Sequence, residues 1–383
     1  MRRQSTKKQR GAVTVITALM MVFLLGIAAL AIDIANALVT RNELQNAADA
    51  AALAAATCLY PRAVCGNPNA NAPDWDTAQQ RARDVVGMNK AQGVKIVVGD
   101  ASSGYWNITS DPAGLESPPV TTGPSHLPAV RVSITKSDSN DNGSVRMFLA
   151  SVIGVHKLDV SAVATAAISY PGIVGPGGLF PMAVSSCLFG KYWQNGSPLI
   201  AKDNKPLPGA TITKKNGQQT PDTTPQTPGQ PYVFKIGTSY QYSGCDAGQW
   251  TTFNTTNNST DFERGVVDGK DMGQGTVSIG QNPGTYIQPG EENALFKYVQ
   301  DCSAAGSKTC EWSIVPIVDS LTPKTYPVVV AYACVHILNA SNGNEPYVLV
   351  QMAMAKDADH CQVKNAGGAG VGYGALQPPR LVQ

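Results

Sequence analysis

The sequence predicts an α+β protein with a long N-terminal helix, then a small α+β domain, then a β-rich domain stabilised by disulfides. Three observations predict this class. Residues 12–32 carry no charge, and the helix-forming residues that follow reach Thr57 without Gly or Pro. Short apolar segments separated by Gly, Pro and Asn dominate the C-terminal half, which is typical of strands and turns. Eight cysteines lie outside the uncharged run.

The uncharged run has the length of a membrane span. As a helix, Ala12 to Ile32 would extend about 30 Å, which is the thickness of a bilayer core. A basic cluster without acidic residues precedes it, so the positive-inside rule places residues 1–11 in the cytoplasm and the chain after Asp33 outside. A cleaved secretory signal peptide is the alternative, because it has the same order of basic and apolar regions.

The helix is predicted to continue outward over residues 33–57. Together with the uncharged run it would form a rod of about 69 Å. Small side chains recur along one side of the outer half, and close approach through small residues is a common way for such helices to associate. The predicted helix-packing residues are Ala47, Ala48, Ala51 and Ala55.

Composition favours an exported protein of two or three domains. The chain has 383 residues, of which 43% are hydrophobic and only 15% charged. Five of its 29 Lys and Arg residues lie in the first ten positions, leaving 24 against 27 acidic residues. The remainder is mildly acidic, so no nucleic-acid surface is predicted.

The cysteines indicate up to four disulfides, because an even set in an exported chain usually pairs. Two pairs are close enough in sequence to close short loops, Cys58 with Cys65 and Cys302 with Cys310. Cys187 with Cys245 and Cys334 with Cys361 follow by elimination.

Turn-rich stretches divide the outer part. We expect a small α+β domain over residues 58–170, with a helix at Asp76 to Lys90 and another at Val145 to Ile153. A Gly- and Pro-rich linker follows at residues 171–181. The β-rich domain is expected over residues 182–365, with a flexible Gly-rich tail at residues 366–383.

The N-terminal module resembles TadE/TadG-like proteins of the Flp (Tad) pilus-assembly system. The matching features are the basic start, Arg10-Gly11-Ala12-Val13, the apolar core, Asp33 at its outer edge, and the run from Leu44 to Ala56 that reads Leu-Gln-Asn-Ala-Ala-Asp-Ala-Ala-Ala-Leu-Ala-Ala-Ala. A looser likeness covers Val130 to Ala167. The resemblance implies a structural, membrane-anchored component of pilus assembly.

Two differences from the family pattern show which kind of TadE/TadG-like protein this chain resembles. Processed prepilins carry Glu at the fifth position after the cleaved Gly, whereas this chain has Ile16 there, so it is more similar to the uncleaved TadG-like branch. Many TadG-like proteins also carry a von Willebrand type A domain with an Asp-x-Ser-x-Ser metal motif. That motif does not occur in this sequence.

Candidate chemistry is sparse, and neither a catalytic site nor a metal or cofactor is predicted. The Asp138-x-Asn140-x-Asn142-Gly143 segment resembles half of an EF-hand calcium loop, but Leu149 occupies the position of its essential carboxylate. The residues Cys334, His336, His360 and Cys361 would suit zinc only as thiolates, and a disulfide is the favoured interpretation. The common hydrolase and phosphate-loop motifs are missing, so no enzyme is predicted.

The functional prediction is a single-pass protein of a bacterial inner membrane, with its bulk periplasmic or at the cell surface. Its expected partners are the lipid bilayer, other pilus-assembly or pilin subunits, and a second copy of the chain. The alternative is an adhesin-like binding module displayed on the same anchor, for which Trp193, Trp250 and Trp312 are candidate sugar platforms.

Overall fold

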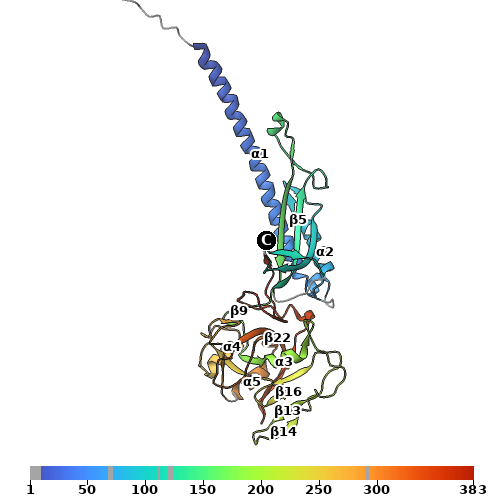
Figure 1. Cartoon of the computed structure of the whole chain (residues 1–383), viewed down its shortest axis with the longest axis vertical. Helices are drawn as coiled ribbons and strands as arrows, with labels where there is room; N and C mark the ends of the chain where they lie inside the picture. Colours follow the sequence, from blue (N-terminus) through green and yellow to red (C-terminus); the bar gives the residue numbers. More distant parts are fainter. Residues whose placement is uncertain (1–9, 68–71, 111, 119–124, 290–292) are drawn as a thin grey trace, which may run out of the picture.

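The computed structural model describes residues 10–67, 72–110, 112–118, 125–289 and 293–383. A long helix enters a first folded unit, and a second folded unit lies beyond its far end (Figure 1). We call these the membrane-proximal and distal units. Mixed helices and sheets confirm the predicted α+β class. Most of the expected cytoplasmic tail, residues 1–9, lies outside the described residues.

Helix α1 runs without interruption from Arg10 to Thr57. Its 48 residues correspond to about 72 Å at the helical rise. The outward continuation of the predicted rod is therefore present. The helix ends where Cys58 and the turn after it leave the helical path.

The membrane-proximal unit is a five-stranded sheet covered by α1 and by α2 (Trp75–Val86). Strand order is β26-β8-β5-β3-β4, and all neighbours are antiparallel. The strands are β3 (Asp100–Asn107), β4 (Gly114–Glu116), β5 (His126–Lys136), β8 (Val160–Ala167) and β26 (Arg380–Leu381). Two small hairpins add β1 (Lys90–Ala91) with β2 (Val94–Lys95) and β6 (Val145–Arg146) with β7 (Lys157–Leu158).

The helix expected at Val145 to Ile153 does not form. Val145 and Arg146 belong to β6, and only a 3-10 turn, η2 (Ala150–Ile153), follows. Val145 and Ala150 are buried, whereas Phe148, Leu149 and Val152 are exposed. The helix expected at Asp76 to Lys90 is present as α2, although it ends earlier, at Val86 before Gly87.

The distal unit is built on an eight-stranded mixed sheet of order β15-β23-β22-β21-β10-β18-β20, with β25 beside β22. Its strands are β10 (Met182–Ser185), β15 (Val233–Ile236), β18 (Gly248–Phe253), β20 (Tyr286–Ile287), β21 (Trp312–Val318), β22 (Val329–Ser341), β23 (Tyr347–Met352) and β25 (Gly372–Tyr373). Helices α3 (Ser186–Tyr192), α4 (Thr260–Val267) and α5 (Asn293–Cys302) accompany it. The sequence pattern predicts one short helix here, at Ala294 to Gln300, which corresponds to α5; it does not predict α3 or α4.

Smaller sheets complete the distal unit. One has four strands, β13 (Ala210–Thr213), β14 (Gln219–Pro221), β16 (Tyr240–Tyr242) and β17 (Cys245–Asp246). Another has three, β9 (Ile173–Val174), β19 (Val277–Ser278) and β24 (Ala366–Gly367), and β11 (Trp193–Gln194) pairs with β12 (Ser197–Pro198). Four disulfides join Cys58 to Cys65, Cys187 to Cys245, Cys302 to Cys310 and Cys334 to Cys361, the same pairs as expected above.

Two segments expected to be unstructured are built into sheets. The linker at residues 171–181 contains β9, and Val174, Leu179 and Phe180 are buried within it. The tail at residues 366–383 contains β24, β25 and β26, so the expectation of a flexible tail is wrong. The glycines made both segments look like loops. Backbone hydrogen bonds between strands need no side chains, however, and close backbone contacts at some of these positions leave no room for a side chain. A Cβ on Gly172 would lie only 2.8 Å from the Ala369 carbonyl oxygen.

Candidate functional site

The first half of α1 is bare. From Val13 to Ile32 nearly every side chain is exposed, including Leu19, Val22 and Phe23. Among the described residues this is the one helix long and apolar enough to cross a membrane. Exposed apolar side chains on all sides of a helix are unfavourable in water and favourable in lipid. The bare half therefore has the properties of an anchor.

The bare half ends at Asp33, whose carboxylate is buried. One carboxylate oxygen accepts the backbone N–H of Phe148 at 2.9 Å, and the other accepts those of Leu149 at 2.9 Å and Ala150 at 2.5 Å. These N–H groups lie at the start of η2, where a 3-10 turn has no internal acceptors for them. Asp33 thus fastens the segment between β6 and β7 to α1.

Beyond Asp33 one side of α1 is buried in the membrane-proximal unit. The buried positions recur at helical spacing and are Asp33, Ala37, Thr40, Leu44, Ala47, Ala48, Ala51, Ala52, Ala55 and Ala56. Their neighbours are β5, β8 and α2. Small side chains are required because the sheet and α2 lie close to the helix backbone.

This placement corrects the interpretation of Ala47, Ala48, Ala51 and Ala55 as a surface for other subunits. Each is at most 1% exposed in the chain's own core. Their small size serves packing within the membrane-proximal unit. The sequence pattern identified the packing side of the helix, but it could not identify which partner covers it.

The opposite side of outer α1 is exposed. Ile34, Leu38 and Val39 lie just beyond Asp33 and are each at least half exposed. Arg41, Asn42, Asn46 and Ala50 continue this side toward Thr57. We call these seven residues the open face. It is the part of outer α1 that remains available to another molecule.

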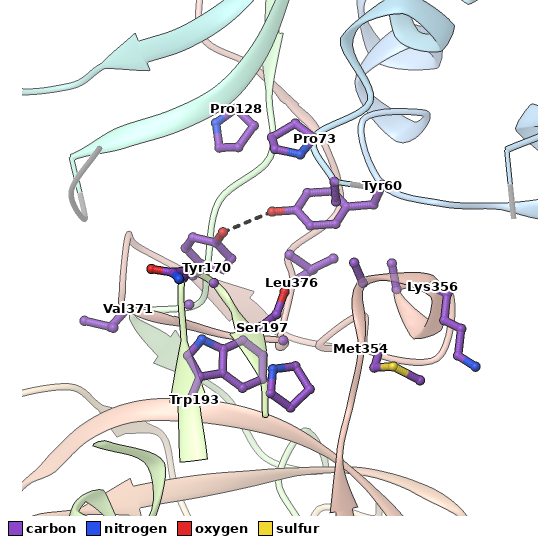
Figure 2. A pocket seen from close by; sticks show the side chains of 18 of the residues that line it. Tyr60, Pro73, Pro128, Tyr170, Trp193, Ser197, Met354, Lys356, Val371 and Leu376 are labelled. Atoms are coloured by element: carbon purple, nitrogen blue, oxygen red, sulfur yellow. Dashed lines mark hydrogen bonds between the residues drawn. The ribbon is translucent and has the colours of Figure 1, made fainter. Parts of the chain in front are cut away.

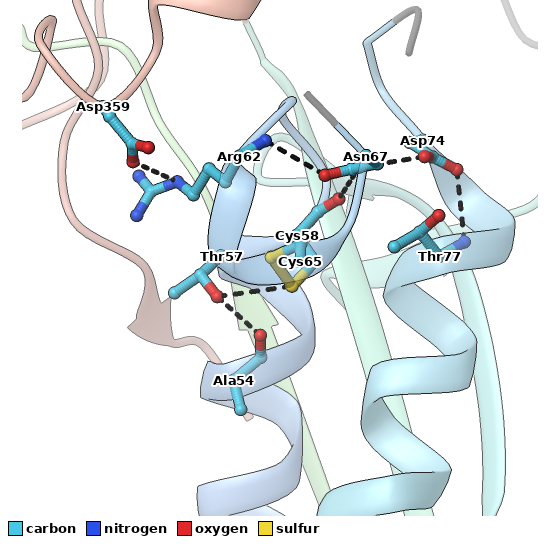
Figure 3. Close-up of a disulfide and its surroundings, with 9 residues drawn as sticks. All are labelled: Ala54, Thr57, Cys58, Arg62, Cys65, Asn67, Asp74, Thr77 and Asp359. Carbon is cyan, nitrogen blue, oxygen red and sulfur yellow. Dashed lines mark hydrogen bonds and ion pairs between the residues drawn. A yellow bond between two sulfur atoms is a disulfide. The ribbon is translucent and has the colours of Figure 1, made fainter. Parts of the chain in front are cut away.

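A disulfide-centred turn closes the far end of α1 (Figure 3). Asn67 donates to the carbonyl of Cys58 at 3.2 Å and to the carboxylate of Asp74 at 2.9 Å, and it accepts the N–H of Arg62 at 3.0 Å. Asp74 caps α2 by accepting the Thr77 N–H at 3.1 Å. The disulfide Cys58–Cys65 therefore holds a turn that joins the end of α1 to the start of α2.

Burial of Asp74 would raise the pKa of its carboxyl group, but hydrogen bonds from Asn67 and Thr77 outweigh burial and lower that pKa. The carboxylate form of Asp74 is thus the form that fits this turn.

The same turn contacts the distal unit. Arg62 makes an ion pair with Asp359 at 3.1 Å. Tyr60, just after α1, and Tyr170, just after β8, share a hydrogen bond of 3.0 Å between their hydroxyls. Burial, and then the neighbouring Tyr170, raises the pKa of Tyr60 well above its ordinary value, so both hydroxyls stay protonated in neutral solution.

A cleft of about 1030 Å³ lies at the junction of the two units (Figure 2). Tyr60, Tyr105 and Tyr170 line it from the membrane-proximal side. Trp193, Met354 and Gly372 of β25 line it from the distal side. An aromatic cleft of this size can accept a small ligand or a peptide side chain.

The metal candidates are used structurally instead. Cys334 and Cys361 form a disulfide, so neither is a thiolate ligand. The rings of His336 and His360 both stack on Trp312, with ring centroids at 4.3 and 5.0 Å from it. Asp138 bonds Ser144 and Lys157, and Asn142 bonds the backbone at Val97 and Val98. In the described ranges no group of three His, Cys, Asp or Glu side chains is arranged to hold a metal ion.

The fold and its anchor define a protein class: one apolar N-terminal helix that carries disulfide-stabilised folded units. Within it, residues 11–57 match the family described as putative Flp pilus-assembly TadE/G-like. The chain thus carries a TadE/G-like Flp pilus-assembly domain, which confirms the resemblance seen in the sequence. Comparison with curated proteins and with solved structures gave no match.

Proposed function

We propose that the chain is a membrane-anchored structural component of Flp/Tad pilus assembly, with no catalytic role. The observation that carries this proposal is the division of α1, whose first half is bare and apolar while its second half forms part of a folded core. The family match at residues 11–57 supports it. In this proposal α1 spans a bacterial inner membrane and holds the folded units on the periplasmic or cell-surface side.

The direction of insertion follows from charge and redox chemistry. Basic residues without acidic ones precede the span, which favours a cytoplasmic N-terminus. All eight cysteines are paired beyond the span, as expected in an oxidising compartment. Mass spectrometry of the mature N-terminus, with carbonate extraction of membranes, tests the anchor. A native chain that starts after Asp33 and is extracted as a soluble protein would overturn it.

The open face of α1 is the docking surface in this proposal. Pilus-assembly subunits, or a second copy of the chain, would pack against Ile34, Leu38 and Val39 next to the bilayer. A Leu38→Asp variant should lose piliation while its abundance, disulfides and membrane association stay at wild-type level. Arg83→Asp on exposed α2 is the matched control. Normal piliation in Leu38→Asp cells would contradict docking through this face.

The aromatic cleft favours a second candidate, a displayed binding module. Glycan arrays probed with the full chain in detergent would test this, with Trp193→Ala as the variant that opens the cleft wall. Binding that is lost in Trp193→Ala would support an adhesin-like role. Binding that is unaffected by Trp193→Ala would place any ligand elsewhere.

A further inference from the structure

The segment between β6 and β7 exposes apolar side chains that a folded protein normally covers. Phe148 is 70% exposed and Val152 is 85% exposed, and Leu149 and Val155 are also exposed. We call residues 147–156 the apolar loop. Contiguous exposed apolar residues mark contact sites for proteins or membranes.

The position of the apolar loop is fixed relative to the anchor. Asp33 holds the backbone of Phe148, Leu149 and Ala150, and Asp33 directly follows the uncharged run that ends at Ile32. The green part of the chain that contains this loop extends alongside α1 toward the helix's N-terminal half (Figure 1). The loop is therefore at the level where α1 leaves the apolar environment.

Charge around the loop fits a bilayer surface. Arg146 and Lys157 are exposed basic residues at the two ends of the loop, and no acidic residue lies between residues 145 and 158, although the exposed Asp159 follows directly after. Lys157 also contacts Asp138 at 2.5 Å. Apolar side chains flanked by basic ones are typical of elements that lie in the interface of a membrane containing anionic lipids.

We propose that the apolar loop is a second membrane contact, with Phe148 and Val152 in the outer interface of the bilayer that α1 spans. This inference rests on the proposed anchoring role. Continuity with the bare half of α1 favours lipid over a protein as the occupant. A single spanning helix is free to rotate about its axis, whereas two contact points fix its rotation and tilt. The loop would thereby set the direction in which the open face points.

Fluorescent labels in reconstituted vesicles test the proposal with the full chain. Because every native cysteine is in a disulfide, an added cysteine can be labelled selectively under non-reducing conditions. Val152→Cys, Phe23→Cys and Met272→Cys, each labelled with NBD, report on the loop, the span and the distal unit. The vesicles contain phosphatidylcholine and phosphatidylglycerol, with or without nitroxide-labelled lipid.

The expected result is blue-shifted emission and loss of intensity by nitroxide lipid at positions 23 and 152, with neither change at position 272. Quenching at position 23 without quenching at 152 overturns the loop contact but leaves the anchor intact. If the label at position 23 is not quenched by nitroxide lipid, α1 does not span the bilayer and the anchoring proposal is overturned. If position 152 is not quenched in vesicles and instead cross-links to a protein in cells, a protein covers the apolar loop and the lipid proposal is wrong.

Asp33→Asn tests whether Asp33 positions the apolar loop at the bilayer, or whether the apolar side chains of the loop are enough to place it there. An Asn side chain has about the volume of Asp33. Its NH₂ group, however, cannot accept the hydrogen bonds that one of the Asp33 carboxylate oxygens accepts from backbone N–H groups. In the labelled Val152→Cys background this change should weaken quenching at position 152 and leave quenching at position 23 unchanged. Equal quenching with and without Asp33→Asn would show that Asp33 does not position the loop.

Discussion

Single carboxylates organise both ends of the outer half of α1. Asp33 gathers three backbone N–H groups where the helix leaves its apolar half, and Asp74 caps α2 at the other end. In each case an oxygen acceptor satisfies backbone donors that have no partner inside their own helix. Local backbone chemistry therefore fixes how the loops attach to the helices.

The cap of α2 gives a measurable stability effect. Asp74→Ala removes the acceptor for the Thr77 N–H and should lower the free energy of unfolding by about 1 kcal/mol. Asp84→Ala on the exposed end of α2 is the control and should change stability little. Chemical denaturation of the purified full chain in detergent, followed by circular dichroism, provides the measurement. Equal stability of the two variants would show that the cap contributes nothing.

The lowered pKa of Asp74 also predicts a pH dependence. Since the folded-state pKa is below that of the unfolded chain, the stabilisation is fully present above the unfolded value of about 3.9 and is lost as pH falls through the lower folded value. The stability difference between wild type and Asp74→Ala should thus be largest at neutral pH and shrink below about pH 4. Denaturation of both proteins at neutral pH and below about pH 4 checks this. A stability difference that is the same at the two pH values would contradict it.

At the scale of elements, α1 combines two environments in one helix. Its bare half suits lipid, and its outer half has a buried side against the sheet and an open face on the other side. Uninterrupted hydrogen bonding along 48 residues makes these parts one rigid rod. Movement of the outer unit would be coupled to the span.

The two sides of outer α1 should respond differently to larger residues. Ala48→Leu places extra methyl groups into a filled core and should destabilise the membrane-proximal unit by about 1–3 kcal/mol. Ala50→Leu, two positions away on the open face, should fold normally. Limited proteolysis of the two variants measures the difference. Equal resistance to protease would show that Ala48 is not tightly packed.

At the scale of the whole molecule, the C-terminal end of the chain returns to the membrane-proximal unit. After passing through the distal unit it adds β26 to the edge of β8, and the Thr165 N–H donates to the Gln383 carbonyl at 2.9 Å. Together with the Arg62–Asp359 ion pair, this strand ties the two units together. Their relative placement therefore depends on residues far apart in sequence.

Removing residues 378–383 should release this connection. The Thr165 amide would lose its acceptor and exchange with deuterium faster, while α5 in the distal unit stays protected. Arg380→Ala keeps the backbone of β26 and is the control. Hydrogen exchange with mass spectrometry on the full and shortened chains measures it. Unchanged exchange at Thr165 would show that β26 contributes nothing to the sheet.

The sequence alone determined the anchor-like helix, the α+β class, the two disulfides that close short loops and the TadE/G-like character of residues 11–57. These features depend on local composition, such as the uncharged run, the cysteine spacing and the Leu44 to Ala56 motif. The tertiary structure decided what covers each side of α1. It buried Ala47, Ala48, Ala51 and Ala55 inside the chain, and it converted the expected helix at Val145 to Ile153 into an exposed loop bound to Asp33. The physical reason is that periodicity shows which side of an element is apolar, whereas only long-range contacts decide whether its own chain, another protein or lipid covers that side.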